Sequence, residues 1–405
     1  MRVGSPGFNG ERLVEARELR GISATALALL VGVSPASISQ YQNGVTTPSP
    51  SVLSEIASKL GFPEGFFFLP DVETRTTATF FRSKANNTKA ARLAAEWKMK
   101  ALVRTMDYLT SYLDVPGYRF VDVLQRDPLA ITHGDIEHAA TALRRAWSIG
   151  DGAIGDLTLL AENHGFVISR HPLYEDREDA LSKPLLDGER DYVLVNADLS
   201  VAVHARFSLA HELGHMVLHR HLTEDERLAH HQTLEKQANR FAGAFLLPST
   251  TFPRDFVAPD VDVFARLKRK WKVSASAMVM RAAALGIITK RQMKSMQVTI
   301  RRRGWHKGEP LDQELVPEEP RLLRRSFGAL LDSGLQSRRD VVTALPYPAE
   351  EIERIAGLAP GTLDPSRTPP ALPRVRVRQD ATEGAHATVY KLSDASAQGT
   401  HRRSS

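Results

Sequence analysis

Residues 206–219 read RFSLAHELGHMVLH and place three polar side chains inside an otherwise apolar segment. His211, Glu212 and His215 are costly to bury unless something compensates them. The apolar side chains around them recur at the spacing of a buried helix; they are Leu209, Leu213, Met216, Val217 and Leu218. Because side chains four positions apart lie on one face of a helix, both histidines can point a ring nitrogen at the same ion.

The pattern H-E-x-x-H is the zinc-binding arrangement of metallopeptidases. Catalytic zinc takes histidine nitrogen at about 2.0–2.1 Å, and its sites use three protein ligands plus water. We therefore predict His211 and His215 as metal ligands and Zn²⁺ as the cofactor. Glu212 adjoins the first ligand, where its carboxylate can take a proton from the activated water. It is the predicted catalytic residue.

A third ligand is needed, and two side chains compete for that place. His219 lies eight residues from His211, which is about 12 Å along a helix axis and too far for one ion. Glu235 lies in LEKQANRFAGAFLLP, whose spacing predicts a second amphipathic helix after a loop and a return. We predict Glu235 as the third ligand, supported by Asn239 one turn later. The alternative is a solvated carboxylate at a helix end.

Several other histidines lie close to these segments in the sequence. They are His204, His219, His221, His230 and His231. We expect each of them to be a surface residue or a hydrogen-bonded core residue. A role for one of them in stabilising an oxyanion or in binding product stays open.

The first seventy residues predict a bundle of short helices. Ser23 and Ser34 are good N-caps, and Pro35 suits a first helical position. Gly32 permits a sharp turn, so that VGVS, residues 31–34, joins two helices closely in the manner of a helix-turn-helix. The generic alternative is a helical bundle used for dimerisation.

The second helix of this pair can present short polar side chains to the major groove of DNA. The predicted DNA-contacting residues are Ser34, Ala36, Ser37, Ser39, Gln40 and Asn43. Residues 1–70 carry only five basic side chains against five acidic ones, although phosphate binding needs Lys or Arg. Cations could come from Arg12, Arg17 and Arg20, or from the basic runs at 82–104 and 263–307. For the last run a solvated basic face is an equal alternative.

These stretches resemble two known families. RFSLAHELGHMVLH followed by EKQANRFAGAFLLP resembles the ImmA/IrrE family of zinc metallo-endopeptidases, over about residues 140–250. Members cleave repressors, often of the helix-turn-helix type, in phage, mobile-element and stress responses. The resemblance implies a gluzincin-like site in which His211, His215 and Glu235 bind zinc and Glu212 is the base. ATALALLVGVSPASISQYQNG resembles the helix-turn-helix of Cro/C1-type (XRE family) repressors.

The expected fold is mainly α (α+β). It comprises a five-helix Cro/C1-type bundle, a small zincin-like domain with a short β-sheet, and a C-terminal helical region. Strands are predicted at 165–169 and 191–196, and further helices at 136–147, 151–164, 206–219 and 232–246. The expected divisions are 8–70 for the helix-turn-helix, 71–135 for a basic helical linker, 136–258 for the peptidase, 259–355 for C-terminal helices and 356–405 for a disordered tail.

The amino-acid composition limits the cellular compartments and the classes of partner that fit this protein. The 405 residues contain no cysteine, which excludes disulfides and thiolate metal sites and suits a reducing compartment. The first residues lack the apolar run of a signal peptide, and no apolar run reaches membrane-spanning length. We expect a cytoplasmic protein with no membrane partner. The net charge of +6 permits a polyanionic partner without establishing one.

Three functions fit these patterns. The first is a transcriptional regulator that binds a double-stranded DNA operator as a dimer. Its zinc endopeptidase domain cleaves the chain itself or another protein, such as a helix-turn-helix repressor. This cleavage belongs to a stress or mobile-element response. The second is a helix-turn-helix regulator whose zincin-like domain is a non-proteolytic sensor. The third is a peptidase whose helix-turn-helix only docks to a partner repressor.

Overall fold

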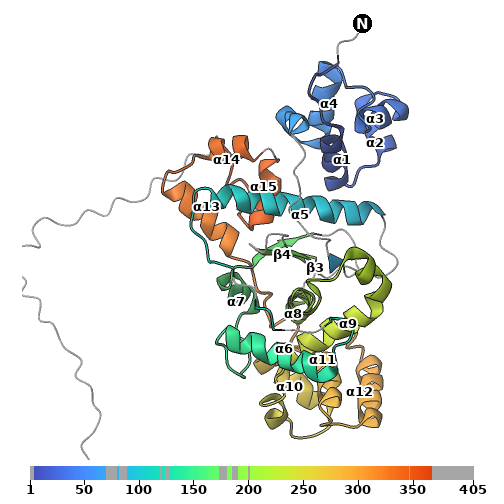
Figure 1. The fold of residues 1–405 in the computed structure, drawn as a ribbon, viewed down its shortest axis with the longest axis vertical. Coiled ribbons are helices and arrows are strands. Elements are labelled where there is room, and N and C mark those ends of the chain that lie inside the picture. The colour runs from blue at the N-terminus through green and yellow to red at the C-terminus, as the bar shows by residue number, and fades with distance from the viewer. Residues whose placement is uncertain are drawn as a thin grey trace, which may run out of the picture. The chain divides into compact units, whose positions relative to one another are not determined.

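The computed structural model describes most of the chain (Figure 1). The described residues are 4–69, 80–81, 89–118, 121–123, 127–172, 180–184, 190–198, 201–345 and 347–366. They contain fifteen α-helices and a four-stranded sheet, which confirms the expected mainly helical α+β fold. The predicted tail beyond residue 366 and the start of the first basic run, 82–88, lie outside the described residues.

The expected five-helix N-terminal bundle is present. Its members are α1 (Gly10–Leu19), α2 (Ala24–Val31), α3 (Pro35–Gln42), α4 (Pro50–Leu60) and the 3-10 helix η1 (Glu64–Phe68). Gly32 ends α2 at a φ of +72°, and the Ser34 hydroxyl accepts the N–H of Ser37 at 3.0 Å to cap α3. The bend of 114° between α2 and α3 is typical of a helix-turn-helix.

Helix α5 (Lys89–Thr110) packs against α1 and extends the core of this bundle. Glu15 of α1 is fully buried at the junction, where it pairs with Arg12 and accepts a hydrogen bond from the Tyr347 hydroxyl at 3.1 Å. Arg104 of α5 donates to the same hydroxyl at 2.7 Å. Residues from both ends of the chain therefore share one core with α5.

The sheet separates two hydrophobic cores. Its strands are β1 (Phe80–Phe81), β2 (Val167–His171), β3 (Ala180–Pro184) and β4 (Asp191–Asn196), in the order β1-β3-β4-β2. Strand β4 runs parallel to β2 and antiparallel to β3. Alternate residues of β4 face opposite sides: Val193 and Val195 join the core that contains α8, whereas Tyr192 and Leu194 join the core that contains α5 (Figure 1).

Helices α6 (His133–Ala146), α7 (Leu157–Asn163), α8 (Ala202–His219) and α9 (Glu224–Leu246) build the first core beside the sheet. All four differ from the predicted starts, and α6 and α8 begin three and four residues early, at His133 and Ala202. Helix α7 begins at Leu157 and not at 151, because the Asp156 side chain caps it there. Helix α9 begins at Glu224 and not at 232, because Thr223 and Glu226 form a capping box upstream of the predicted start.

The strand predictions were right in type but incomplete. Strand β4 has the predicted bounds, 191–196. Strand β2 begins two residues after the predicted start, because Gly165 occupies the turn after α7 with a φ of +87°. Strand β3 was not predicted: five residues ending in a proline, ALSKP, carry little strand signal of their own.

The later helices divide between the two cores. Helices α10 (Val261–Trp271), α11 (Ala275–Ala284) and α12 (Lys290–Arg302), after the 3-10 helix η2 (Phe252–Asp255), belong to the core of α8 and α9. Helices α13 (Leu322–Asp332), α14 (Arg338–Ala344) and α15 (Ala349–Ala356) belong to the core of α5. No single described helix is long and apolar enough to cross a membrane, and the bent pair α2–α3 meets that test only when its halves are counted together.

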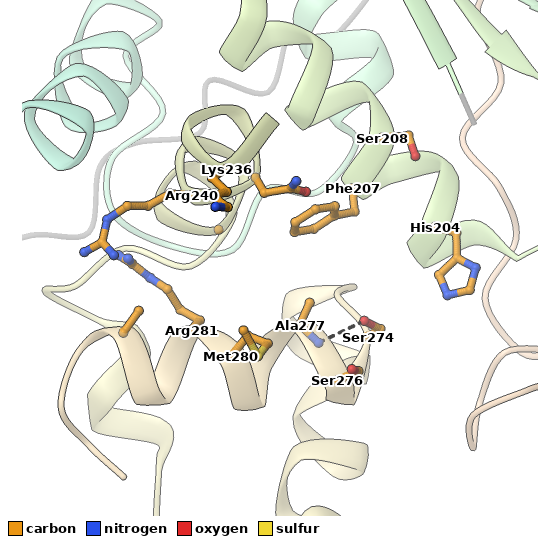
Figure 2. Close-up of a pocket in the computed structure, with 13 residues that line it drawn as sticks. His204, Phe207, Ser208, Lys236, Arg240, Ser274, Ser276, Ala277, Met280 and Arg281 are labelled. Atoms are coloured by element: carbon orange, nitrogen blue, oxygen red, sulfur yellow. Dashed lines mark hydrogen bonds between the residues drawn. The ribbon is translucent and has the colours of Figure 1, made fainter. Parts of the chain in front are cut away.

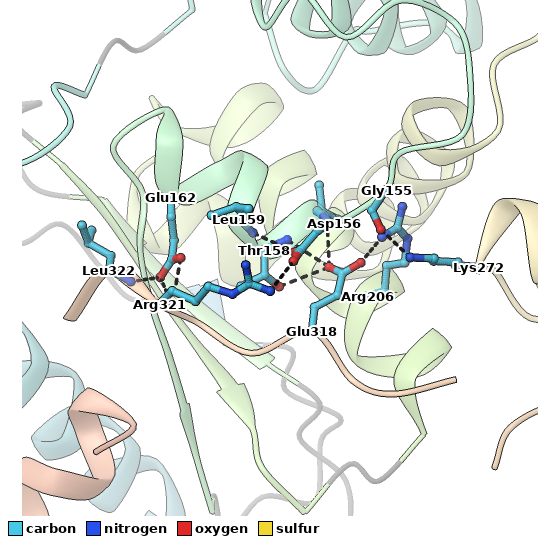
Figure 3. A network of polar contacts seen from close by, with 11 residues as sticks. Gly155, Asp156, Thr158, Leu159, Glu162, Arg206, Lys272, Glu318, Arg321 and Leu322 are labelled. Atoms are coloured by element: carbon cyan, nitrogen blue, oxygen red, sulfur yellow. Dashed lines mark hydrogen bonds and ion pairs between the residues drawn. The ribbon is translucent and has the colours of Figure 1, made fainter. Parts of the chain in front are cut away.

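The segment before α13 is fixed by two carboxylates (Figure 3). Glu318 accepts the N–H of Leu157 at 2.8 Å, at the start of α7, and pairs with Arg206 of α8. Glu162, near the end of α7, accepts the N–H of Arg321 at 2.9 Å. These contacts tie the segment to α7 and to the helix that carries the H-E-x-x-H pattern.

Candidate metal centre and DNA-contacting helix

Helix α8 is buried along almost its whole length, between the sheet and α9. Gly214 of α8 lies in tight contact with α9. A Cβ atom there would lie 3.2 Å from the Ala238 main-chain oxygen and 3.1 Å from the Phe241 ring. A Cβ at these distances would require α9 to shift by a few tenths of an ångström, so glycine favours the close packing that brings Glu235 of α9 to the two histidines of α8.

The three predicted ligands come together at this crossing. The Nε2 atoms of His211 and His215 are 3.0 Å apart. The Glu235 carboxylate lies 3.1 Å from Nε2 of His215 and 3.4 Å from Nε2 of His211. In a tetrahedral site with zinc–ligand distances of about 2.0–2.1 Å, ligand atoms stand about 3.3 Å apart. The donor set of two imidazole nitrogens and one carboxylate oxygen therefore fits zinc in both chemistry and spacing.

Burial and neighbouring charges set the protonation states of His215 and Glu235 in a way that suits cation binding. Burial lowers the pKa of His215 to about 4, so its imidazole is neutral near pH 7. Burial alone would raise the pKa of Glu235, but hydrogen bonds and charge from His211 and His215 outweigh it and hold the pKa of this carboxyl below its ordinary value. The neutral His215 ring can thus offer a lone pair to a cation, and the carboxylate keeps its negative charge.

Glu212 lies on the buried α8 with 1% of its surface exposed. One of its carboxylate oxygens, Oε2, accepts a hydrogen bond from the Ser182 hydroxyl of β3 at 2.5 Å. Sequence reasoning missed Ser182, because its strand was not predicted. Asn239, the predicted support for Glu235, donates to the main-chain carbonyl of Glu235 at 2.7 Å and leaves the carboxylate to the histidines.

A cavity of about 680 Å³ lies about one helical turn from the three predicted ligands, none of which is among its described lining residues (Figure 2). It lies between α8, α9 and α11, and Figure 2 shows Phe207 and Met280 on its walls. Ser208 lines it three positions before His211. Among the described residues no acidic side chain lines it, while Lys236 and Arg240 do. The cavity can therefore accept an extended apolar or acidic segment about one turn from the three predicted ligands.

The predicted DNA-contacting residues lie together on α3 and its two ends. Ser34, Ala36, Ser39, Gln40 and Asn43 are exposed, and Ser37 is half-buried. Two of the six also serve the helix itself, because Ser34 and Ser37 bond to each other through their hydroxyls at 2.8 Å. The others present a neutral, largely polar surface.

Three arginines of the N-terminal bundle that could bind phosphate beside this surface bond within the protein instead. Arg12, one of the possible sources of phosphate-binding charge, is buried and paired with Glu15. Arg17 bonds to Glu18 at 2.6 Å and to a main-chain carbonyl, and Arg20 bonds to the Leu60 carbonyl at 2.7 Å. No sequence pattern predicts these contacts, because tertiary packing determines the partners of the arginines.

The fold and the ligand cluster define a helix-turn-helix protein fused to a metallopeptidase-like domain. Comparisons with known families agree. Residues 13–67 match the helix-turn-helix family model, and residues 161–283 match the model of the IrrE N-terminal-like domain. A search of curated proteins finds no match. The chain thus joins an XRE-type helix-turn-helix to an ImmA/IrrE-type domain, and couples a DNA-binding segment to a protease-like module.

Proposed function

We propose that the chain is a DNA-binding transcriptional regulator whose second domain is a zinc-dependent endopeptidase. Its substrate is a repressor or the chain itself, and it acts in a stress or mobile-element response. The observation that carries this proposal is the convergence of His211, His215 and Glu235 on one point, with ligand atoms within 4.8 Å of one another. Homodimeric binding to an operator and cytoplasmic location are part of the proposal.

The roles of the side chains follow from their positions. His211, His215 and Glu235 would hold the zinc ion. Bound zinc supplies Lewis-acid chemistry for peptide hydrolysis. Glu212 takes a proton from the attacking water and passes it to the leaving nitrogen. The Ser182 hydroxyl holds the Glu212 carboxylate in a fixed orientation.

Substrate binding would use the cavity between α8, α9 and α11. A chain segment lying there would contact Ser208 and Asn239, which are one turn from His211 and Glu235. The described lining residues include no acidic side chain, which favours apolar or acidic residues in the substrate. The division of the chain at residues 70, 135, 258 and 355 stays a prediction.

The proposal is tested by the Glu212→Gln variant. The variant should retain zinc and DNA binding, because the substitution alters neither a metal ligand nor the N-terminal bundle, but should lose cleavage. Cells producing the parent or the variant are compared by mapping new protein N-termini and by chromatin occupancy. Glu224→Gln, an exposed change on α9, is the control.

The outcomes separate the competing functions. Fragments that appear with the parent and the control but not with Glu212→Gln support the endopeptidase. Zinc bound by every form with no fragment in any of them would favour the non-proteolytic sensor. Cleavage together with failure to bind genomic DNA at low salt would favour a peptidase that docks through its N-terminal bundle.

A further inference from the structure

Beyond the three ligands, a chain of hydrogen bonds continues from His215 into the core. Nδ1 of His215 lies 3.0 Å from Nδ1 of His219, one turn later on α8. Nε2 of His219 lies 2.8 Å from Oε1 of Gln237 on α9. The Gln237 amide nitrogen donates to the Pro128 carbonyl at 3.2 Å. His219 is fully buried, so it is not one of the surface histidines.

Metal binding by His215 fixes every proton in this chain. A ligand nitrogen must present a lone pair, so Nε2 of His215 is unprotonated and its Nδ1 carries the hydrogen. Nδ1 of His219 must then accept, which leaves the hydrogen of His219 on Nε2. That N–H donates to Oε1 of Gln237, and the Gln237 amide is oriented by the Pro128 carbonyl, which can only accept. All four groups agree with a single tautomer of His215.

We propose that His219 and Gln237 are positioning residues that hold His215 in its zinc-binding tautomer and orientation; this inference rests on the metal site proposed above. Such outer partners orient ligands and raise their basicity. The other histidine ligand lacks an equivalent, because Nδ1 of His211 is buried with no hydrogen-bond partner among the described residues. The support is therefore specific to His215.

The test is the zinc affinity of the full chain, measured by competition with a chromophoric chelator. Gln237→Leu keeps the approximate size of the side chain but removes the acceptor, and should weaken zinc binding about 10- to 100-fold. Gln237→Glu restores an acceptor for the His219 N–H and should bind close to the parent. The unfolding midpoint of each zinc-free form is measured in parallel.

The outcomes are distinct. If Gln237→Leu lowers the unfolding midpoint but binds zinc like the parent, the residue is merely structural and the inference is overturned. If Gln237→Glu is as weak as Gln237→Leu, the acceptor is not what matters, which also overturns it. If the parent itself binds no zinc, the metal site fails and this inference fails with it.

A second observation concerns the exposed face of α12. Five exposed cations lie on it, namely Lys290, Arg291, Lys294, Arg301 and Arg302. At 3.6 residues per turn they fall on one side of the helix, opposite the buried Met296 and Ile300. Among the described residues none of the five has an acidic partner, whereas the adjacent Arg303 pairs with Asp262 at 2.5 Å.

We infer that this cationic face of α12 binds the phosphates of duplex nucleic acid. The face extends about 18 Å, over which each DNA strand carries about five phosphates. The N-terminal bundle needs such help, because Arg12, Arg17 and Arg20 are engaged internally. Charge complementarity, together with the internal bonds of these three arginines, favours DNA over other anionic partners.

The test compares two triple variants of the full chain on a duplex of random sequence. Lys290→Gln/Lys294→Gln/Arg301→Gln neutralises the cationic face of α12. Arg324→Gln/Arg325→Gln/Arg339→Gln removes the same charge from exposed positions on α13 and α14. The first should reduce the slope of log K against log salt by up to about three, and the second should not. Equal slopes would overturn the inference, as would binding to anionic phosphatidylserine vesicles in place of DNA.

Discussion

The Glu318 carboxylate pairs with the guanidinium of Arg206 on α8 and at the same time accepts the N–H of Leu157, the first residue of α7. One side chain from the C-terminal part of the chain therefore fixes both a helix start and a buried arginine on α8, the helix that carries the H-E-x-x-H pattern. Arg206 has 4% of its surface exposed, so it depends on this partner.

Replacing Glu318 should destabilise the protein strongly. Glu318→Gln leaves the buried Arg206 without its counter-charge, and we expect the free energy of unfolding to fall by about 3 kcal/mol. Glu319→Gln is the matched control, because Glu319 pairs with Arg170 while 56% of its side chain is exposed, and its loss should cost under about 1 kcal/mol. Denaturant titration compares the two variants. Equal losses would show that burial of the pair is unimportant.

The proximity of His211 and His215 was predictable because helical periodicity alone puts the two residues on one face. Glu235 required an inference about how α9 returns, and the structure places its carboxylate beside both histidines. Ser182 and the partners of His219 were not predictable, because they depend on strand β3 and on the crossing of α8 with α9. Such contacts between distant segments leave no periodic trace in the sequence.

Gly214 should be indispensable to the ligand geometry. In Gly214→Ala the new Cβ would lie 3.2 Å from the Ala238 backbone and push α9 away from α8. Because Glu235 is on α9, its carboxylate would then move away from His211 and His215. We expect weaker zinc binding and a loss of about 1–3 kcal/mol in unfolding free energy. Gly243→Ala, whose nearest neighbour would be the Arg281 Cδ at 3.8 Å, should leave zinc affinity unchanged. Chelator competition and thermal unfolding measure both; a Gly214→Ala protein with parental zinc affinity would refute the close-packing argument.

We expect the free energy of unfolding to rise at alkaline pH because Lys98 is buried. Burial lowers its pKa from 10.5 to about 8. Between these values the unfolded chain binds the extra proton, so the free energy of unfolding should increase with pH, by about 2 kcal/mol from pH 8 to pH 10. Lys98→Met should lack this increase. The exposed Lys59→Met is the control, and a parental slope in Lys98→Met would contradict the assignment.

Gln40 should contribute to recognition of specific DNA. Its exposed amide on α3 can bond bidentately to adenine, so Gln40→Ala should weaken binding to a selected operator by about 1–3 kcal/mol without changing affinity for random duplex. The operator is first enriched from a random library with the parent protein, and affinity is then measured by fluorescence anisotropy. Gln232→Ala, an exposed change on α9, serves as the control. An equal effect on both duplexes would mean that Gln40 reads no base.

The N-terminal bundle shows where prediction from sequence stops. Caps and turns at Ser34 and Gly32 are local, and both are confirmed by the structure. Arg12 and Glu15 also lie only three residues apart in the sequence. The burial of this ion pair nevertheless depends on Trp97 of α5 and on Tyr347, which are distant in the sequence. A charge that looks available to DNA in the sequence is therefore enclosed in the fold.

Zinc content decides whether the three ligands form a metal site. The parent, Glu212→Gln and Glu235→Ala are purified without added chelator, and zinc per chain is measured by plasma mass spectrometry after dialysis. We expect one zinc ion per chain in the parent and in Glu212→Gln, and little in Glu235→Ala, because two histidines alone hold the ion weakly. A parent without stoichiometric zinc, or a Glu235→Ala protein that keeps all of it, would contradict the proposed site.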